Sequence, residues 1–189
     1  MPVTKILCLD LAGQTGFAIW SPAMDQPLYG AVRLPKASLG QTFASFRDFL
    51  SGKIVGERIE HVAIESPYID KVSLNAVEKL YGLKAHAEEI CYRRGVPCRP
   101  VSSAEWRKHF IGQPRAPQTL AKAQRRKWLK DQVRLECQRR GWAVTSDDEA
   151  DALGVLVYER ARILPRWGCD TELFGYEQIA PPMGMERVP

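Results

Sequence analysis

Residues 146–153 read Ser-Asp-Asp-Glu-Ala-Asp-Ala-Leu, which puts four carboxylates into five positions directly before an apolar run. Side chains three residues apart share a face of a helix, so Asp148 and Asp151 are expected to point the same way. Two carboxylates held side by side repel each other, and a divalent cation relieves that repulsion. The alternative is an acidic first helical turn, with Ser146 or Asp147 as its cap. The octet alone leaves both interpretations open.

Upstream of the octet, the basic residues are concentrated in one segment. Between residues 122 and 140 there are eight Lys and Arg against two acids, a local charge of +6, whereas the whole chain carries +5. The segment is expected to form a helix over about 120–140. A basic helix beside an acidic cluster indicates a polyanionic substrate and a site that holds cations.

The overall composition fits one water-soluble domain. The chain has 189 residues, of which 45% are hydrophobic and 26% charged. No apolar run reaches membrane-spanning length, and the N-terminus lacks the anatomy of a signal peptide. The five cysteines form no C-x-x-C pair and the three histidines are scattered, which argues against a disulfide framework or a zinc site. We therefore expect a cytoplasmic protein, with one domain at 1–164 and an irregular tail at 165–189.

Two further acids interrupt segments that are expected to be buried strands. Residues 5–11 are apolar on both faces of a strand, so Asp10 is costly there unless it is paired or bound to metal. Residues 61–67 predict another short buried strand, which Pro67 stops just after Glu65. The glycine-containing turn at 12–16 favours a tight hairpin over a phosphate-binding loop.

The remaining pattern predicts an α/β fold. Strands are expected at 17–20, 29–34 and 96–101, and helices at 39–50, at 74–94, from Ser102 or Ser103, and from the octet to about 162. If the strands of Asp10 and Glu65 are neighbours, the last helix would bring Asp148 and Asp151 over them. Four such carboxylates suit Mg²⁺, with Mn²⁺ as a substitute. Two such ions support in-line hydrolysis of a phosphodiester.

Three short blocks of this sequence resemble a known family. They are Leu9-Asp10 with the following Gly and Thr-Gly, Ala63-Ile64-Glu65, and Asp148-x-x-Asp151-Ala152-Leu153. They are similar to the signature motifs of RuvC-type Holliday junction resolvases of the RNase H-like superfamily, over roughly residues 5–162. The resemblance implies an RNase H-like mixed five-stranded sheet flanked by helices. It also implies a homodimeric, Mg²⁺-dependent endonuclease that nicks opposing strands of a four-way DNA junction.

The resemblance assigns roles to individual residues. It places the four metal-binding acids on Asp10, Glu65, Asp148 and Asp151, and leaves Asp147 as a cap or an acid outside direct contact with the metal. Lys122 and Arg107 match basic positions near the scissile phosphate. Tyr68 matches an aromatic position at the junction centre, where stacking on a base and plain packing are equally expected. Phosphate-backbone contacts are expected from Lys108, Arg115, Arg125, Arg126, Lys127 and Lys130.

The sequence also departs from the cellular resolvases. Leu11-Ala12 stands where they usually carry Pro-Gly, and the proline-rich loop at 113–118 and the tail look like additions. In this the chain resembles virus-encoded members, which implies that its substrates could include forks and flaps. The rival hypotheses are a nuclease for RNA–DNA hybrids, a sugar-kinase-like ATPase fragment, for which the chain is short, and a non-catalytic module that binds branched DNA. The helix at 74–94 is the expected dimer contact.

Overall fold

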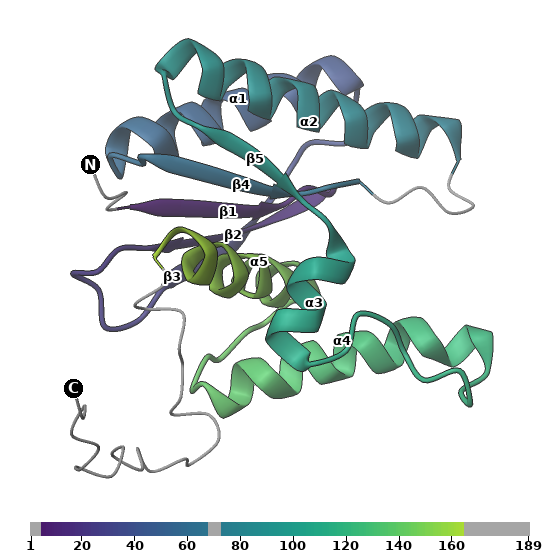
Figure 1. Cartoon of the computed structure of the whole chain (residues 1–189). Helices are drawn as coiled ribbons and strands as arrows, with labels where there is room; N and C mark the ends of the chain where they lie inside the picture. Colours follow the sequence, from purple (N-terminus) through teal and green to yellow (C-terminus); the bar gives the residue numbers. More distant parts are fainter. Residues whose placement is uncertain (1–4, 68–72, 165–189) are drawn as a thin grey trace, which may run out of the picture.

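A mixed five-stranded sheet in the order β3-β2-β1-β4-β5 forms the centre of the molecule (Figure 1). The computed structural model describes residues 5–67 and 73–164, so Tyr68 and the tail at 165–189 lie outside the described residues. The strands are β1 (Ile6–Asp10), β2 (Gln14–Trp20), β3 (Leu28–Arg33), β4 (His61–Glu65) and β5 (Cys98–Val101). β1 runs antiparallel to β2 and parallel to β4, which confirms the expected α/β fold.

β1 is the middle strand because its side chains are apolar on both faces. Ile6 and Cys8 belong to the core on one side of the sheet, and Leu7 and Leu9 to the core on the other. All four are fully buried. The same register pairs Leu9 with Ile64 of β4, so Asp10 and Glu65 end neighbouring parallel strands at the same edge of the sheet.

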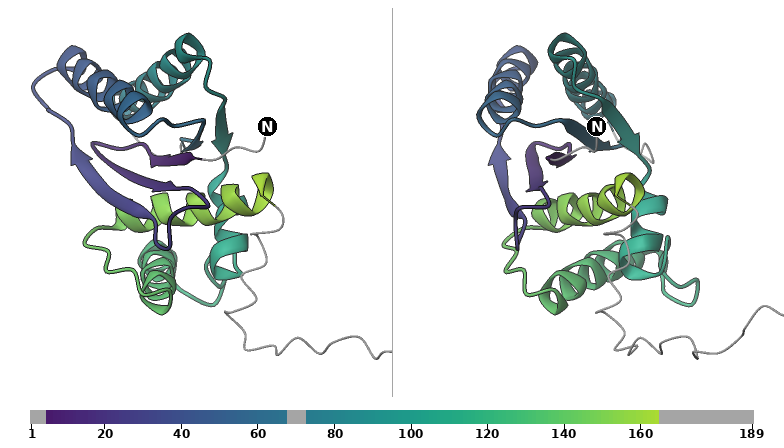
Figure 2. Two further views of the ribbon diagram at one scale, coloured as in Figure 1. Left: turned by 90° about the vertical axis from the view of Figure 1, so that its left-hand side faces the viewer. Right: turned by 60° about the vertical axis from the view of Figure 1, so that its left-hand side comes forward.

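Helices cover both faces of the sheet in layers (Figures 1 and 2). α1 (Leu39–Gly56) and α2 (Leu74–Arg94) pack on one face, and α5 (Asp147–Ile163) packs on the other. α3 (Ser103–Ile111) and α4 (Lys122–Arg139) lie against α5, away from the sheet. The first helix continues six residues beyond the expected end at Leu50, because Ile54 extends its buried face.

The two helices that contribute side chains to the acidic edge of the sheet, α3 and α5, begin with the same capping motif. Ser102 caps α3 and Ser146 caps α5, and in each case a glutamate three residues later closes a capping box. These reciprocal bonds satisfy backbone N–H groups that a helix start leaves free. Ser146, not Asp147, is therefore the cap of the acidic helix.

Farther along α5, a buried carboxylate that sequence reasoning overlooked joins three elements. Glu159 is 0% exposed. Its carboxylate accepts hydrogen bonds from His61 Nε2 at 2.8 Å, Arg99 Nη1 at 2.7 Å and Arg162 Nη2 at 2.7 Å. Burial acts to raise the pKa of Glu159, but these hydrogen bonds and the two arginine charges outweigh it and lower the pKa to about 2. The spacing carried a signal, since Glu159 lies four residues after the apolar Val155 on the same helical face.

Replacing Glu159 with glutamine should destabilise the protein by about 3 kcal/mol at pH 7, because it leaves cations without their buried counter-charge. A carboxyl group whose pKa is lowered by folding stabilises the fold above its unfolded value, here 4.5, and that stability is lost as the pH falls through about 2. Urea unfolding from pH 7 to pH 2 should therefore show a smaller acid-dependent loss in Glu159→Gln than in the wild type. As a control, Glu57→Gln removes a surface pair with Lys5 and should cost under about 1 kcal/mol. Equal effects of the two variants would contradict the role of the buried network.

Candidate active site

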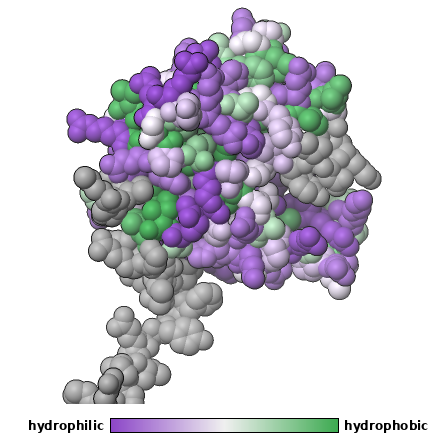
Figure 3. Space-filling model, turned by 45° about the horizontal axis from the view of Figure 1, so that its top comes forward, coloured by the Kyte–Doolittle hydropathy of each residue, from purple (hydrophilic) through white to green (hydrophobic). Residues whose placement is uncertain are grey.

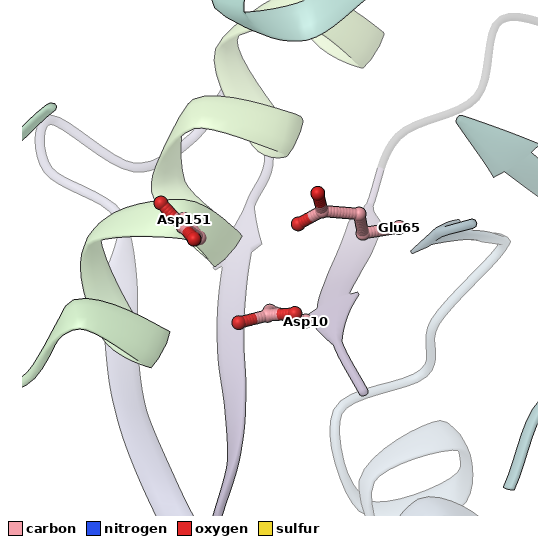
Figure 4. A group of neighbouring side chains, drawn as sticks. All are labelled: Asp10, Glu65 and Asp151. Atoms are coloured by element: carbon pink, nitrogen blue, oxygen red, sulfur yellow. The ribbon is translucent and has the colours of Figure 1, made fainter. Parts of the chain in front are cut away.

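Three carboxylates meet at the edge of the sheet where β1 and β4 end (Figure 4). Asp10 is the last residue of β1, Glu65 the last of β4, and Asp151 lies one turn into α5. One oxygen from each of the three lies within 4.8 Å of the other two. Because all the ligand atoms are oxygens, the cluster could hold a hard divalent metal.

The pKa values of these carboxyl groups show that burying their negative charges together is unfavourable. Burial, followed by the charges of Glu65 and Asp151, raises the pKa of Asp10 well above its usual value. Burial, followed by the charge of Glu65, raises the pKa of Asp151 to about 7, although Arg107 opposes the shift. A metal ion would relieve this repulsion, and perturbed carboxylates of this kind are common at functional sites.

Asp148 lies beside the cluster and is not one of the three carboxylates that meet. Its charge nevertheless acts on Asp10. Burial raises the pKa of Asp148, while the nearby Lys130 and a hydrogen bond with the Gln14 side chain act in the opposite direction. The structure therefore brings together three of the four expected metal ligands and places the fourth at the margin.

Close contact between α5 and the sheet depends on Gly16. This residue lies opposite Asp10 in the β1–β2 pair. A Cβ atom added there would lie 1.9 Å from the backbone oxygen of Asp148 and 2.3 Å from its carbonyl carbon. The missing side chain lets the first turn of the acidic helix approach β2.

α3 contributes two more groups to the site. Ser103 Oγ donates a hydrogen bond to Glu65. A terminal nitrogen of Arg107, Nη2, lies 3.6 Å from Glu65 Oε1 and 3.9 Å from Asp151 Oδ2, and its guanidinium packs on the Trp106 ring. Arg107 thus places a positive charge beside the carboxylates of Glu65 and Asp151. The contact of Ser103 was missed, because the sequence showed it only as a helix cap.

The other expected DNA-binding residues occupy different surroundings. Lys108 and Arg115 are exposed, as are Lys122 and Arg126 on α4. The exposed Lys127 pairs with Asp131 at 2.9 Å on the helix surface.

Two other members of that set have partners within the chain. Arg125 donates to the backbone oxygens of Leu120 and Gln118, and so anchors the loop before its own helix. Lys130 and Arg134 both donate to Asp147. Sequence reasoning did not foresee that pairing.

Comparison with solved structures identifies the fold. The chain superposes on Thermus thermophilus RuvC with a TM-score of 0.62 and 15% identity, over 87% of this chain and 96% of that one. The T. thermophilus RuvC complex with a Holliday junction substrate gives a TM-score of 0.62 at 14% identity, with the same coverage. The yeast mitochondrial Holliday junction resolvase Ydc2 gives 0.54 at 14% identity, over 92% of this chain and 82% of that one. The chain has the RuvC fold.

That likeness lies in the fold and not in the overall sequence. No model of a protein family matches the chain, and no match to a curated protein sequence was found. Within the described ranges, no helix combines the length and apolar character needed to cross a membrane.

Proposed function

We propose that this protein is a Mg²⁺-dependent, structure-selective endodeoxyribonuclease that cleaves four-way DNA junctions. The observation that carries the proposal is the convergence of Asp10, Glu65 and Asp151 at one edge of a sheet with the RuvC fold. The structural neighbours include a RuvC complex with a Holliday junction and a Holliday junction resolvase, which supports the same class of substrate here. The cysteines among the described residues form no disulfide, which favours a cytoplasmic location.

The carboxylates are the groups that would hold the metal. Asp10, Glu65 and Asp151 offer an oxygen-only set of ligands, which suits Mg²⁺ or Mn²⁺ and is poor for zinc. Asp148 is proposed as the fourth ligand. When bound, two such ions supply an activated water and stabilise the leaving oxygen of a phosphodiester. The hydrogen bond from Ser103 limits the rotation of Glu65 and keeps its carboxylate turned toward its partners.

The basic groups would bind the DNA. Arg107 lies against the carboxylates, where a guanidinium can contact the scissile phosphate and offset the charge that develops on it. Its Nε is buried and has no hydrogen-bond partner among the described residues. Lys122 is proposed as a second catalytic cation, and Lys108, Arg115, Arg126 and Lys127 as backbone contacts that strengthen binding without reading sequence.

A dimer would let two such sites cut opposing strands of one junction. Apolar side chains occur in separate patches among polar ones on the face that α1 and α2 present (Figure 3). Three of the exposed large apolar residues belong to α2: Leu74 at 80% exposure, Tyr81 at 47% and Tyr92 at 87%. This supports the proposal that α2 makes the dimer contact. Because the chain departs from the cellular resolvases, forks and flaps are included as substrates.

A cleavage assay tests the function directly. The purified protein is incubated with a four-way junction, a flap, a fork, an RNA–DNA hybrid and a linear duplex, each with Mg²⁺, with Mn²⁺ and with a chelator. We expect paired nicks in the junction that require the metal. Preferential cleavage of the hybrid would instead identify a nuclease for RNA–DNA hybrids, and binding of branched DNA without cleavage would identify a non-catalytic module.

A further inference from the structure

Asp147, the first residue of α5, is held by two cations from α4. Arg134 Nε donates to Asp147 Oδ1 at 2.7 Å, and Lys130 Nζ donates to the other oxygen. Lys130 and Arg134 are four residues apart and project from the same side of their helix. The two ion pairs, called the Asp147 clamp below, join the basic helix to the start of the helix that carries Asp151.

The clamp holds the start of the helix that carries Asp148 and Asp151. Asp147 is followed directly by Asp148 and, one turn later, by Asp151. The capping box at Ser146 orders this turn internally, but it does not set where the turn lies relative to the sheet. β2 contacts α5 on one side, and α4 contacts it on another. The clamp therefore restricts movement of the acidic turn relative to α4.

The clamp cations are less exposed to solvent than a cation on the outer side of the same helix. The side chain of Lys127 is 81% exposed, whereas those of Lys130 and Arg134 are 34% and 41% exposed. Both oxygens of Asp147 are engaged by cations. The alternative, in which Lys130 grips a DNA phosphate, would require it to leave this partner.

We propose that Asp147, Lys130 and Arg134 are positioning residues, which hold the first turn of α5 so that its carboxylates can share a metal with Asp10 and Glu65. The inference rests on the proposed metal-dependent nuclease. Partners that orient metal ligands without touching the metal typically account for about 10–100-fold in metal affinity. We expect loss of one clamp cation to lie at the lower end, at about tenfold.

Charge removal and loss of positioning predict opposite changes in the metal affinity of Lys130→Gln. The charge of Lys130 acts on both Asp148 and Asp151. A cation so close to the carboxylates opposes binding of a metal ion, so its removal alone should tighten binding. The clamp predicts the reverse, because the acidic turn loses its support.

The experiment measures Mn²⁺ binding to the DNA-free protein by calorimetry, together with junction affinity in a chelator and junction cleavage as a function of Mg²⁺ concentration. Lys130→Gln and Arg134→Gln should each bind Mn²⁺ about tenfold more weakly and need correspondingly more Mg²⁺ for cleavage. Lys130→Arg should restore binding toward the wild type. Lys127→Gln, a matched change on the same helix, should weaken junction binding and leave Mn²⁺ binding unchanged.

Mn²⁺ binding by the variants and by the wild type distinguishes failure of the clamp from failure of the proposed metal site. If Lys130→Gln and Arg134→Gln bind Mn²⁺ as tightly as the wild type, or more tightly, the clamp does not position the site, and a loss confined to junction affinity would assign both cations to DNA. If the wild type binds no Mn²⁺, or if Asp10→Asn does not weaken binding, the proposed metal site itself is wrong. Circular dichroism of each variant checks that the fold is intact.

Discussion

Asp10→Asn is expected to reduce Mg²⁺-dependent cleavage of a four-way junction by about 10²–10³-fold, which is the typical loss of rate when an active site loses one electrostatic stabiliser. Asp10 ends the central strand, and its carboxylate shares the cluster with Glu65 and Asp151. The amide has almost the same shape but carries no charge for a metal. Junction binding in a chelator should survive, because the proposed backbone contacts lie on other residues. Single-turnover cleavage and a binding titration measure the two effects separately.

The same substitution should stabilise the metal-free protein. Burial and the charges of Glu65 and Asp151 raise the pKa of Asp10, so its ionised form is a liability when no cation is bound. Asp48→Asn, an exposed position on α1, is the matched control and should change neither cleavage nor stability. Full activity of Asp10→Asn would remove the basis for the proposed metal site.

Gly16→Ala is expected to produce the second large effect, a destabilisation of about 2–3 kcal/mol together with a loss of cleavage of about 10²-fold. The new methyl group would fall 1.9 Å from the backbone oxygen of Asp148, and backbone atoms cannot move aside as a flexible side chain does. α5 would have to shift away from β2, and the two acids in its first turns would move with it. Urea unfolding and single-turnover cleavage measure the two losses.

Gly13→Ala provides the control, because it makes the same change in the preceding turn. A methyl group at Gly13 would lie 3.1 Å from Lys79 Nζ, the far end of a flexible side chain that can swing away. We expect nearly wild-type stability and cleavage. If both glycine variants behave alike, close approach of α5 to the sheet is not what Gly16 provides.

Much of the candidate site could be predicted from local chemistry. A carboxylate inside an apolar strand is costly enough to mark Asp10, and Glu65 stands out at the end of another such strand just before a proline. Spacing alone puts Asp148 and Asp151 on one helical face. Their convergence was a hypothesis that required two strands far apart in sequence to be neighbours, and β1 and β4 do pair in parallel.

The hydrogen-bond and ion-pair partners of individual side chains could not be predicted from the sequence. Ser103 and Lys130 were identified correctly as belonging to a helix start and a basic helix, but their contacts with Glu65 and Asp147 come from other elements. A count of charges cannot distinguish a lysine that faces solvent from one that holds an acid of a neighbouring helix. The difference depends on how α4 is rotated against α5.

The amino-acid sequence by itself determined where the strands and helices lie and which carboxylates stand at their ends, because hydrophobic period, capping residues and the cost of a buried charge act over a few neighbouring positions. Only the tertiary structure decided that Asp151 joins Asp10 and Glu65 while Asp148 stays at the margin, and that Arg107 lies against them. The place of Asp151 and Asp148 depends on how closely α5 approaches β2 across Gly16, a distance of a few ångströms between segments more than a hundred residues apart.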